Sequence, residues 1–377
     1  MTITHVRARA VAIPLERETS ISTRRLAERH YLLVEVGTAG GAGVGYCYAG
    51  TAGGRLLAAA VEELLLPVLR DAPADDIGGL WERMYQETLL VGRRGALLRA
   101  ISAVDIALWD LRAKACGVPL AVLLGGSVAR PVPAYASGGY YRPDDGPPEE
   151  AVAREITRNR EAGFTDHKIK VGGLSVEQDA ARVAAAVRAM EGQGRLALDA
   201  NNAYRTPEEA LRAARAFERA AGDVGVWWFE EPLPPDDIDG HAQLARMLET
   251  PVATGEIHQT RWEFAQLIRC RGADVLQPDA GVLGGVTEWL RVAQAAATFA
   301  LPVAPHWHAN LHAHLVAATP NATVVEHFEL AKDIYNFERL LTEDSRLQVR
   351  DGAIHLSDRP GIGIEFDERV VKRYELT

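Results

Sequence analysis

Cysteine, excess basic charge and long apolar runs are all scarce in this sequence. Three of its 377 residues are cysteine and no C-x-x-C pair occurs, which excludes a disulfide framework. No apolar run approaches the roughly 18 residues of a membrane span, and the N-terminal stretch carries too many charges for a signal peptide. The formal net charge of −10 argues against a nucleic-acid-binding surface. We therefore expect a cytoplasmic protein that acts on a small molecule, with no nucleic-acid or membrane partner.

Phosphate-binding loops are missing as well. The glycine-rich stretch 37–54 follows an apolar segment, but its glycines do not have the G-x-G-x-x-G spacing. No G-x-x-x-x-G-K-[ST] motif is present either. We expect this stretch to be an active-site flap or a plain loop, not a nucleotide site.

The first part of the chain, residues 1–128, is predicted to form a small α+β domain. Segments 4–15 and 29–38 carry strand-like apolar residues, and the polar segment between them is expected to be a mobile loop. Helical spacing follows in three segments: 54–70, 77–90 and 95–116. The last of these places Ile101, Val104, Asp105, Leu108 and Leu111 on one face.

From residue 129 to 330, short apolar segments alternate with amphipathic helices. The eight strand candidates are 132–139, 167–172, 195–201, 225–232, 251–256, 273–279, 301–307 and 323–328. This alternation favours a parallel (β/α)8 barrel over an open sheet. Residues 331–377 contain a short hairpin with a Gly/Pro-rich turn, and we expect this segment to return to the N-terminal domain.

Polar residues end the second to eighth of these strands, where barrel active sites lie. They are Lys168 and Lys170, Asp199 with Asn201, Glu230 with Glu231, Glu256, Asp279, His306 and Glu326. From Lys170 onward the steps between successive strands are 20 to 31 residues, about one βα unit each. A closed barrel therefore gathers these side chains at one mouth.

Three of these residues, Asp199, Glu230 and Glu256, are carboxylates on consecutive strands. Three converging acids repel one another unless a counter-charge lies between them. An all-oxygen ligand set suits Mg²⁺, with water or substrate completing the octahedron. The alternative for any single acid is an ion pair with an arginine from a neighbouring loop. We expect a magnesium site.

The remaining strand-end residues suit proton transfer. Lys168 and Lys170 share one face of a strand, where like charge and burial both lower a lysine's pKa, so we expect Lys170 to be a neutral base. Asp279 beside His306 is expected to fix the imidazole tautomer and raise its basicity. Glu326 is expected to donate a hydrogen bond to an enediolate if its pKa is raised. Together these groups predict abstraction of the α-proton of a carboxylate substrate.

Several motifs in this order resemble the enolase superfamily, specifically the mandelate racemase subgroup. They are "KIK" (168–170), "DAN" (199–201), "WFEEP" (228–232), "TGE" (254–256), "QPDAG" (277–281), "PHW" (305–307) and "AATPNATVVEHF" (317–328). The resemblance implies a modified (β/α)7β TIM-type barrel, of the α/β class, under an α+β capping domain. It implies that Asp199, Glu230 and Glu256 bind Mg²⁺, and that the chain forms a homo-oligomer. It also implies that Lys170, assisted by Lys168, and the His306–Asp279 dyad transfer protons, while Glu326 stabilises the enediolate.

The reaction expected from this resemblance is dehydration of an aldonic or aldaric sugar acid to a 2-keto-3-deoxy acid. Racemisation, epimerisation or cycloisomerisation on the same site is the alternative, and a Schiff-base lyase is a remote one. The substrate-binding candidates are Asn201, His258, His308, Tyr140, Tyr141 and Arg24. Taken one by one, the arginines on the segment between the first two strands are better explained as solvated loop charges.

Overall fold

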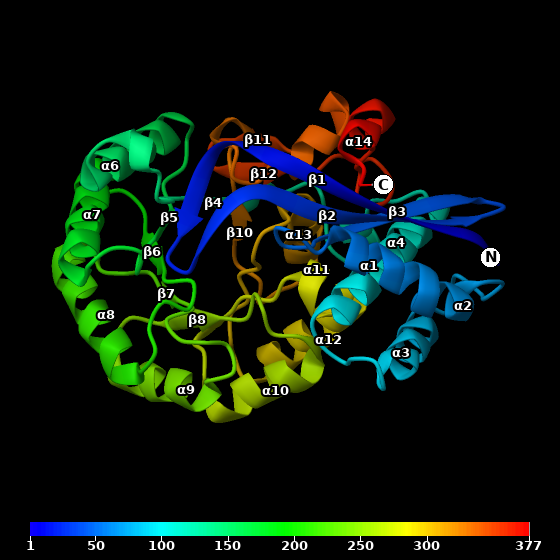
Figure 1. Cartoon of the computed structure of the whole chain (residues 1–377), viewed down its shortest axis with the longest axis horizontal. Helices are drawn as coiled ribbons and strands as arrows, with labels where there is room; N and C mark the ends of the chain where they lie inside the picture. Colours follow the sequence, from blue (N-terminus) through cyan, green and yellow to red (C-terminus); the bar gives the residue numbers. More distant parts are fainter. Residues whose placement is uncertain (377) are drawn as a thin grey trace.

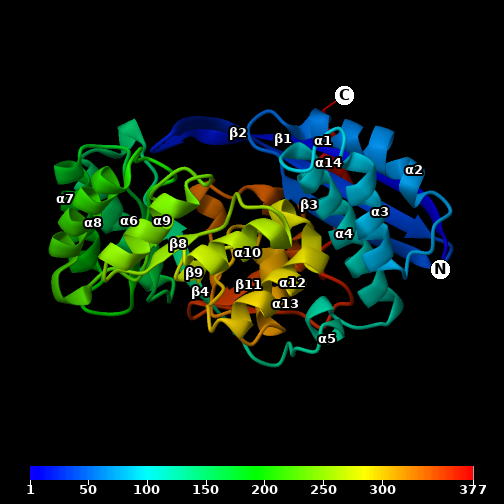
Figure 2. The ribbon, with the colours of Figure 1, turned by 90° about the horizontal axis from the view of Figure 1, so that it is seen from below.

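The computed structural model describes residues 1–376, which form a capping domain beside a barrel (Figures 1 and 2). The capping domain begins with an antiparallel sheet in the order β1 (Ile3–Ile21), β2 (Arg24–Thr38), β3 (Gly41–Tyr48). Its helical segments are α1 (Gly54–Ala60), the π-helix η1 (Val61–Leu65), α2 (Leu66–Leu69), α3 (Ile77–Thr88) and α4 (Ala96–Ala115). This is the α+β cap that the sequence predicted.

Residues 41–48 of the glycine-rich stretch form the strand β3, so the expectation of a flap or loop was wrong for that part of it. The strand needs its glycines because α4 crosses it closely. A Cβ atom on Gly43 would lie 2.1 Å from the carbonyl oxygen of Ala107, and one on Gly45 would lie 2.0 Å from that of Ala103. Glycine here permits close helix–sheet packing, a reason that the sequence pattern does not reveal.

The segment expected to be a mobile loop is instead the end of the long β1–β2 hairpin. The two strands pair as far as Ile21 and Arg24, so only two residues form the turn. In both views the hairpin lies across one end of the barrel (Figures 1 and 2). Its main chain pairs with Tyr141, and Ser22 Oγ donates to the carbonyl oxygen of Ala200 at 2.5 Å.

The barrel strands are parallel neighbours in chain order, and they close into a ring. They are β4 (Val132–Gly138), β5 (His167–Lys170), β6 (Leu196–Asp199), β7 (Phe229–Glu230), β8 (Val252–Thr254), β9 (Val275–Leu276) and β10 (Val325–His327). Between β9 and β10 the seventh predicted strand is reduced to bridges from Val303 to Leu276 and Ala322. β10 then pairs with β4 and completes the barrel.

Helices cover the outside of this ring, as Figure 1 shows. They are α6 (Pro148–Glu161), α7 (Val176–Ala189), α8 (Pro207–Ala221), α9 (Ile238–Met247), α10 (Thr260–Cys270), α12 (Gly285–Thr298) and α13 (Ala309–Ala317). The short α11 (Ala280–Leu283) lies against α4 and β3 of the cap, and the short α5 (Leu120–Leu123) links the cap to the barrel. The predicted modified (β/α)7β barrel is confirmed.

Helix α4 anchors the cap to the barrel. Its predicted face is buried, including Asp105, which is fully buried. Asp105 accepts hydrogen bonds from the main-chain N–H of Thr287 at 2.9 Å and from its hydroxyl at 2.6 Å, and Thr287 belongs to the barrel helix α12. The cap is therefore held in a fixed position over the strand ends.

The C-terminal segment divides between the two parts. The hairpin of β11 (Gln348–Arg350) and β12 (Ala353–His355) pairs with β4 of the barrel, so it does not fold onto the cap as expected. Only the end of the chain returns to the cap. There α14 (Glu368–Tyr374) lies beside β1, and Arg9 pairs with Glu368 at 2.7 Å.

Candidate active site

The barrel register places three charged side chains next to one another. Lys170 pairs with Asp199 across β5 and β6, and Asp199 pairs with Glu230 across β6 and β7. Each of these residues is the last of its strand, because the apolar run ends there and the chain turns toward the next helix. Glu256 follows the end of β8 by two residues. Parallel strands thus bring to one rim residues that are far apart in sequence.

Asp199, Glu230 and Glu256 form a carboxylate cluster. Each offers a ligand oxygen, and these three atoms lie within 4.8 Å of one another. Hydrogen bonds orient two of these carboxylates: the N–H of Asn201 donates to Asp199 at 2.9 Å, and Trp228 Nε1 donates to Glu230 at 2.8 Å. Glu256 Oε2 is buried and accepts no hydrogen bond from residues 1–376. An all-oxygen set with an unused acceptor fits Mg²⁺.

Glu231 adds a fourth carboxylate to this rim. It is fully buried, and neither of its carboxylate oxygens has a hydrogen-bond partner in the described part of the chain. Burial and the charges of Glu256 and Asp199 raise its pKa well above the ordinary value. Its backbone has a left-handed φ of 42°, a strained conformation for glutamate. The sequence placed Glu231 at this strand end but assigned it no role.

The lysines are paired with the acids, which corrects the expected protonation of Lys170. Lys168 Nζ lies 2.5 Å from Glu230 and 2.8 Å from Glu326, and Lys170 Nζ donates to Asp199. Burial lowers the pKa of Lys170, but Asp199, Tyr140 and Glu256 together outweigh it and raise this pKa above the ordinary value. The sequence argument considered only the neighbouring lysine and missed the acid across the strand. Lys170 is a cation in this arrangement.

His306 and Asp279 form the dyad expected from the sequence. His306 Nδ1 lies 3.0 Å from Asp279 Oδ2, and its Nε2 lies 3.5 Å from Glu256 Oε2. Burial lowers the pKa of His306, whereas Glu256 and Asp279 raise it, with a net rise to about 9. The imidazolium is therefore the dominant form at neutral pH, and its Nε2–H points toward the carboxylate cluster. Such a group can act as a general acid that protonates a leaving group.

Glu326 does not have the raised pKa that its expected role required. Burial raises its pKa, but the charges of Lys168, His306 and Lys170 together outweigh this and lower it to about 2. Its other oxygen, Oε2, accepts a hydrogen bond from the main-chain N–H of Trp307 at 2.7 Å. Glu326 is thus an ionised acceptor, and Lys168 is the nearby group with protons to donate.

Of the six substrate-binding candidates, the structure brings Tyr140 and Asn201 to the site. The ring of Tyr140 lies 5.1 Å from Lys170 Nζ. Asn201 is next to the cluster, and its side-chain oxygen is buried without a partner among residues 1–376. Both side chains therefore remain available to a ligand.

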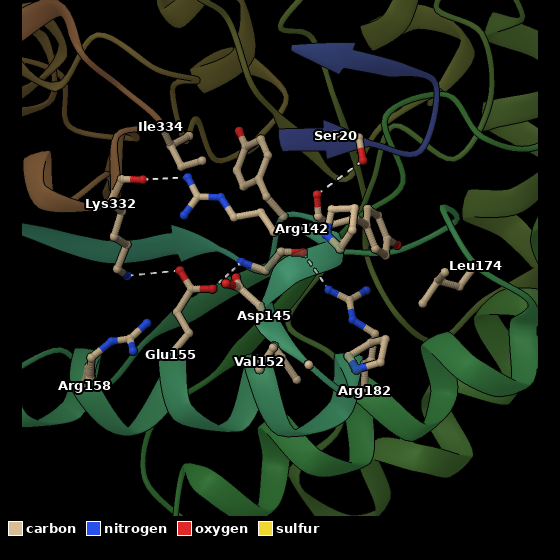
Figure 3. Close-up of a pocket in the computed structure, with 17 residues that line it drawn as sticks. Ser20, Arg142, Asp145, Val152, Glu155, Arg158, Leu174, Arg182, Lys332 and Ile334 are labelled. Carbon is tan, nitrogen blue, oxygen red and sulfur yellow. Dashed lines mark hydrogen bonds and ion pairs between the residues drawn. The ribbon is translucent and has the colours of Figure 1, made fainter. Parts of the chain in front are cut away.

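Tyr141 lies in the wall of a neighbouring cavity of about 260 Å³, which Tyr140 also lines (Figure 3). Its hydroxyl donates to Asp179 at 3.0 Å, and its main chain pairs with Ser20 of the β1–β2 hairpin. Arg182, labelled on the floor of this cavity, donates to the carbonyl oxygen of Lys170 at 2.7 Å. The cavity thus lies next to β5, the strand that carries Lys170. Tyr141 connects the β1–β2 hairpin to the barrel.

His258, His308 and Arg24 lie away from the cluster. His308 is buried between the main-chain N–H of Tyr48 and the hydroxyl of Tyr335, each 3.2 Å away. His258 lines a separate cavity of about 420 Å³ with Arg94 and other residues. Arg24 is exposed at the hairpin turn. Strand ends and loop positions alone did not show which way these side chains face.

Comparison with known proteins agrees with this fold. Residues 3–125 match the mandelate racemase / muconate lactonizing enzyme N-terminal domain family, and residues 151–370 match the enolase C-terminal domain-like family. The chain therefore belongs to the enolase superfamily, in the mandelate racemase/muconate lactonizing enzyme subgroup.

Within that family, the chain is similar to the following two relatives and one solved structure. It is 36% identical to L-talarate/galactarate dehydratase of Salmonella typhimurium, over 89% of this chain and 80% of that protein. It is 37% identical to arabinonate dehydratase of Saccharolobus solfataricus, over 84% and 82%. The crystal structure of L-talarate dehydratase from Polaromonas sp. JS666, complexed with Mg and L-glucarate, superposes with a TM-score of 0.88 at 35% identity, covering 100% of this chain and 97% of that one. Magnesium is thus bound in this family beside a sugar acid.

Proposed function

We propose that this chain is a magnesium-dependent hydro-lyase that converts an aldonic or aldaric acid to a 2-keto-3-deoxy acid. The observation that carries the proposal is the position of two proton-transfer groups on the carboxylate cluster. Lys170 is bonded to Asp199, and His306 Nε2 lies 3.5 Å from Glu256. A substrate held at the cluster has a base within reach on one side and an acid on the other. The dehydratase relatives support this assignment.

The Mg²⁺ ion held by Asp199, Glu230 and Glu256 supplies a Lewis acid that binds the substrate carboxylate and stabilises negative charge. Before turnover Lys170 gives its ammonium proton to solvent. The neutral amine then takes the α-proton at Nζ and becomes the ammonium ion that pairs with Asp199. The electron pair of that C–H bond forms the enediolate, toward which Lys168 is held by Glu326.

His306 completes the dehydration. The electron pair of the enediolate moves to form the Cα–Cβ double bond, and the β C–O bond breaks. His306 gives its Nε2 proton to the departing hydroxyl, which leaves as water, while Asp279 holds Nδ1–H at 3.0 Å. The resulting enol becomes the 2-keto-3-deoxy acid by taking up a proton at the β-carbon and releasing its O–H proton to solvent.

Isomerisation is the second candidate function, and the same geometry favours it. With proton-transfer groups on two sides, an enediolate formed by one group can be protonated by the other. This gives racemisation or epimerisation, or cycloisomerisation of a lactone.

The Schiff-base lyase is disfavoured because imine chemistry needs no metal cluster, whereas Asp199, Glu230 and Glu256 converge at this site. Borohydride added with substrate is expected to leave Lys170 unmodified, and covalent trapping there would contradict this assignment.

A library of mono- and diacid sugars, incubated with Mg²⁺ in D₂O, tests the proposal. Formation of a 2-keto acid is the expected result, measured as a semicarbazone. Deuterium uptake at the α-carbon without keto product would replace dehydration by isomerisation. If no sugar acid gives either keto product or deuterium uptake, both dehydration and isomerisation are contradicted.

We also propose a cytoplasmic homo-oligomer that binds neither nucleic acid nor membrane. Within residues 1–376, no helix combines the length and apolarity that crossing a membrane requires. Leu90 and Val91 are largely exposed beside the cap, and half-exposed Trp262 lies on α10. Exposed apolar side chains of this size favour a subunit interface. Light scattering after size exclusion is expected to give a mass above one chain of 40.9 kDa.

A further inference from the structure

Arg29 is a buried cation without a carboxylate partner. It belongs to β2 and is only 2% exposed. Its guanidinium donates to the main-chain oxygen of Ile334 at 2.5 Å and to the hydroxyl of Tyr48 at 3.0 Å, both uncharged acceptors. Its Nη2 atom has no hydrogen-bond partner in the described chain. A buried charge that nothing balances is costly, so a counter-charge from a ligand is expected.

A second buried donor without an acceptor lies against this arginine. The Arg29 guanidinium carbon sits 4.6 Å from the centre of the Trp307 ring, and Trp307 Nε1 also has no partner among residues 1–376. Trp307 directly follows His306, and their rings stack 5.5 Å apart. Two unused donors beside the acid/base histidine call for an acceptor-rich, anionic group.

Tyr48 is the member of this cluster that a ligand can reach. Its side chain is half-buried, and its ring lies 5.7 Å from that of Trp307. Its main chain is held on both sides, since its N–H donates to His308 at 3.2 Å and its carbonyl oxygen accepts from Arg99 at 2.8 Å. Its hydroxyl oxygen accepts from Arg29, and within the described residues the hydroxyl proton finds no acceptor. Donation from a guanidinium polarises the phenol and makes its O–H a stronger donor.

The cluster of Arg29, Tyr48 and Trp307 adjoins both proton-transfer sides of the site. Trp307 connects it to His306 along the chain. On the other side, Tyr140 lies 5.1 Å from Lys170 Nζ, and the charges of Lys170 and Arg29 both act on its hydroxyl. A substrate spanning from the carboxylate cluster toward the cap therefore meets these donors.

We propose that Tyr48 contacts the substrate end distant from the metal, that Arg29 is the positioning residue behind it, and that this end carries a second carboxylate. The preferred substrate is then an aldaric acid over the aldonic acid of the same length and stereochemistry. This inference rests on the proposed sugar-acid function and deepens it. The cap, through β2 and β3, selects the diacid, while the barrel carries out the chemistry.

Steady-state kinetics with a matched pair of acids tests this assignment. The pair is a six-carbon aldaric acid that the wild type turns over and its C6-alcohol aldonic counterpart. The variants are Tyr48→Phe, Arg29→Met and Arg29→Lys, with Arg25→Met as the control because Arg25 lies on the same strand but is 86% exposed. Circular dichroism and thermal unfolding establish that each variant is folded, and Tyr48→Phe changes only one hydroxyl.

Tyr48→Phe and Arg29→Met are expected to raise KM for the diacid about 10- to 100-fold, the usual effect of losing a hydrogen bond to a charged group. The kcat value and the kinetics on the monoacid are expected to change far less. Arg29→Lys keeps the charge and should recover part of the diacid preference, while Arg25→Met should match the wild type. A merely structural role would lower activity on both acids equally.

Two results would overturn the inference while leaving the proposed function intact. One is a wild-type enzyme that prefers the monoacid. The other is a Tyr48→Phe variant whose ratio of diacid to monoacid kcat/KM is unchanged. Absence of turnover for every sugar acid would instead overturn the proposed function, and this inference with it.

Discussion

Removal of Lys168 should expose how strongly the carboxylate cluster depends on positive charge. In Lys168→Met, Glu230 and Glu326 lose ion pairs of 2.5 and 2.8 Å, and Asp199 loses one of 3.7 Å, all fully or almost fully buried. Breaking a buried pair by removing one partner costs about 3–5 kcal/mol. We expect that loss in the free energy of unfolding when EDTA removes metal.

Magnesium should then restore part of the lost free energy of unfolding, because Mg²⁺ and Lys168 both supply positive charge to the same carboxylates. At 100 times its Kd, a ligand stabilises the folded state by about 2.7 kcal/mol. With the lysine gone, we expect Mg²⁺ to bind about tenfold more tightly, which adds about 1.4 kcal/mol to its stabilisation.

Urea unfolding with EDTA and with Mg²⁺ measures both quantities. Lys114→Met is the matched control, since Lys114 pairs with buried Asp110 at 2.6 Å outside the metal cluster. Any stability it loses should not respond to Mg²⁺. If Mg²⁺ stabilised wild type and Lys168→Met equally, Lys168 would not be the counter-charge of the site.

Three further changes test other parts of the structure. Asp279→Asn should lower kcat about 10²- to 10⁴-fold, because His306 loses the carboxylate that keeps it protonated and oriented; keto-acid formation at near-native thermal stability checks this. Burial lowers the pKa of His314 to about 4; the unfolded chain therefore binds the proton first, and up to about 3 kcal/mol of stability should be lost as pH falls from 6.5 toward 4. His314→Gln should flatten that pH dependence in urea unfolding, and an unchanged slope would refute the assignment. Gly45→Ala should destabilise the protein by about 1–3 kcal/mol, because the new Cβ would meet the carbonyl oxygen of Ala103; an unchanged melting temperature would contradict this close packing.

The location of the site was readable from the sequence to an unusual degree. Barrel strands all point the same way, so the residues that end the apolar runs lie at one rim. A regular spacing between these residues along the chain therefore predicts that their side chains meet in one site. On that basis Asp199, Glu230 and Glu256 were expected together, and the structure places their oxygens within 4.8 Å. The Asp279–His306 pair was predicted for the same reason.

Protonation and pairing were not readable in this way. The sequence shows that Lys168 and Lys170 share a strand face, but it does not show that each lies against a carboxylate of another strand. A pKa depends on every charge within a few ångströms, and most of these come from distant parts of the chain. The expectation for Lys170 overlooked its ion pair with Asp199, and the raised pKa on which the role of Glu326 depended is instead lowered.

What the sequence determined by itself was periodic and local: which runs are strands, where each ends, and which polar residue stands at that end. What only the tertiary structure decided was every contact between cap and barrel, such as Arg29 against Trp307 and Gly45 beneath α4. The physical reason is that side-chain direction along a strand follows from a two-residue repeat, whereas the approach of two separate domains is set by packing across hundreds of residues of intervening chain.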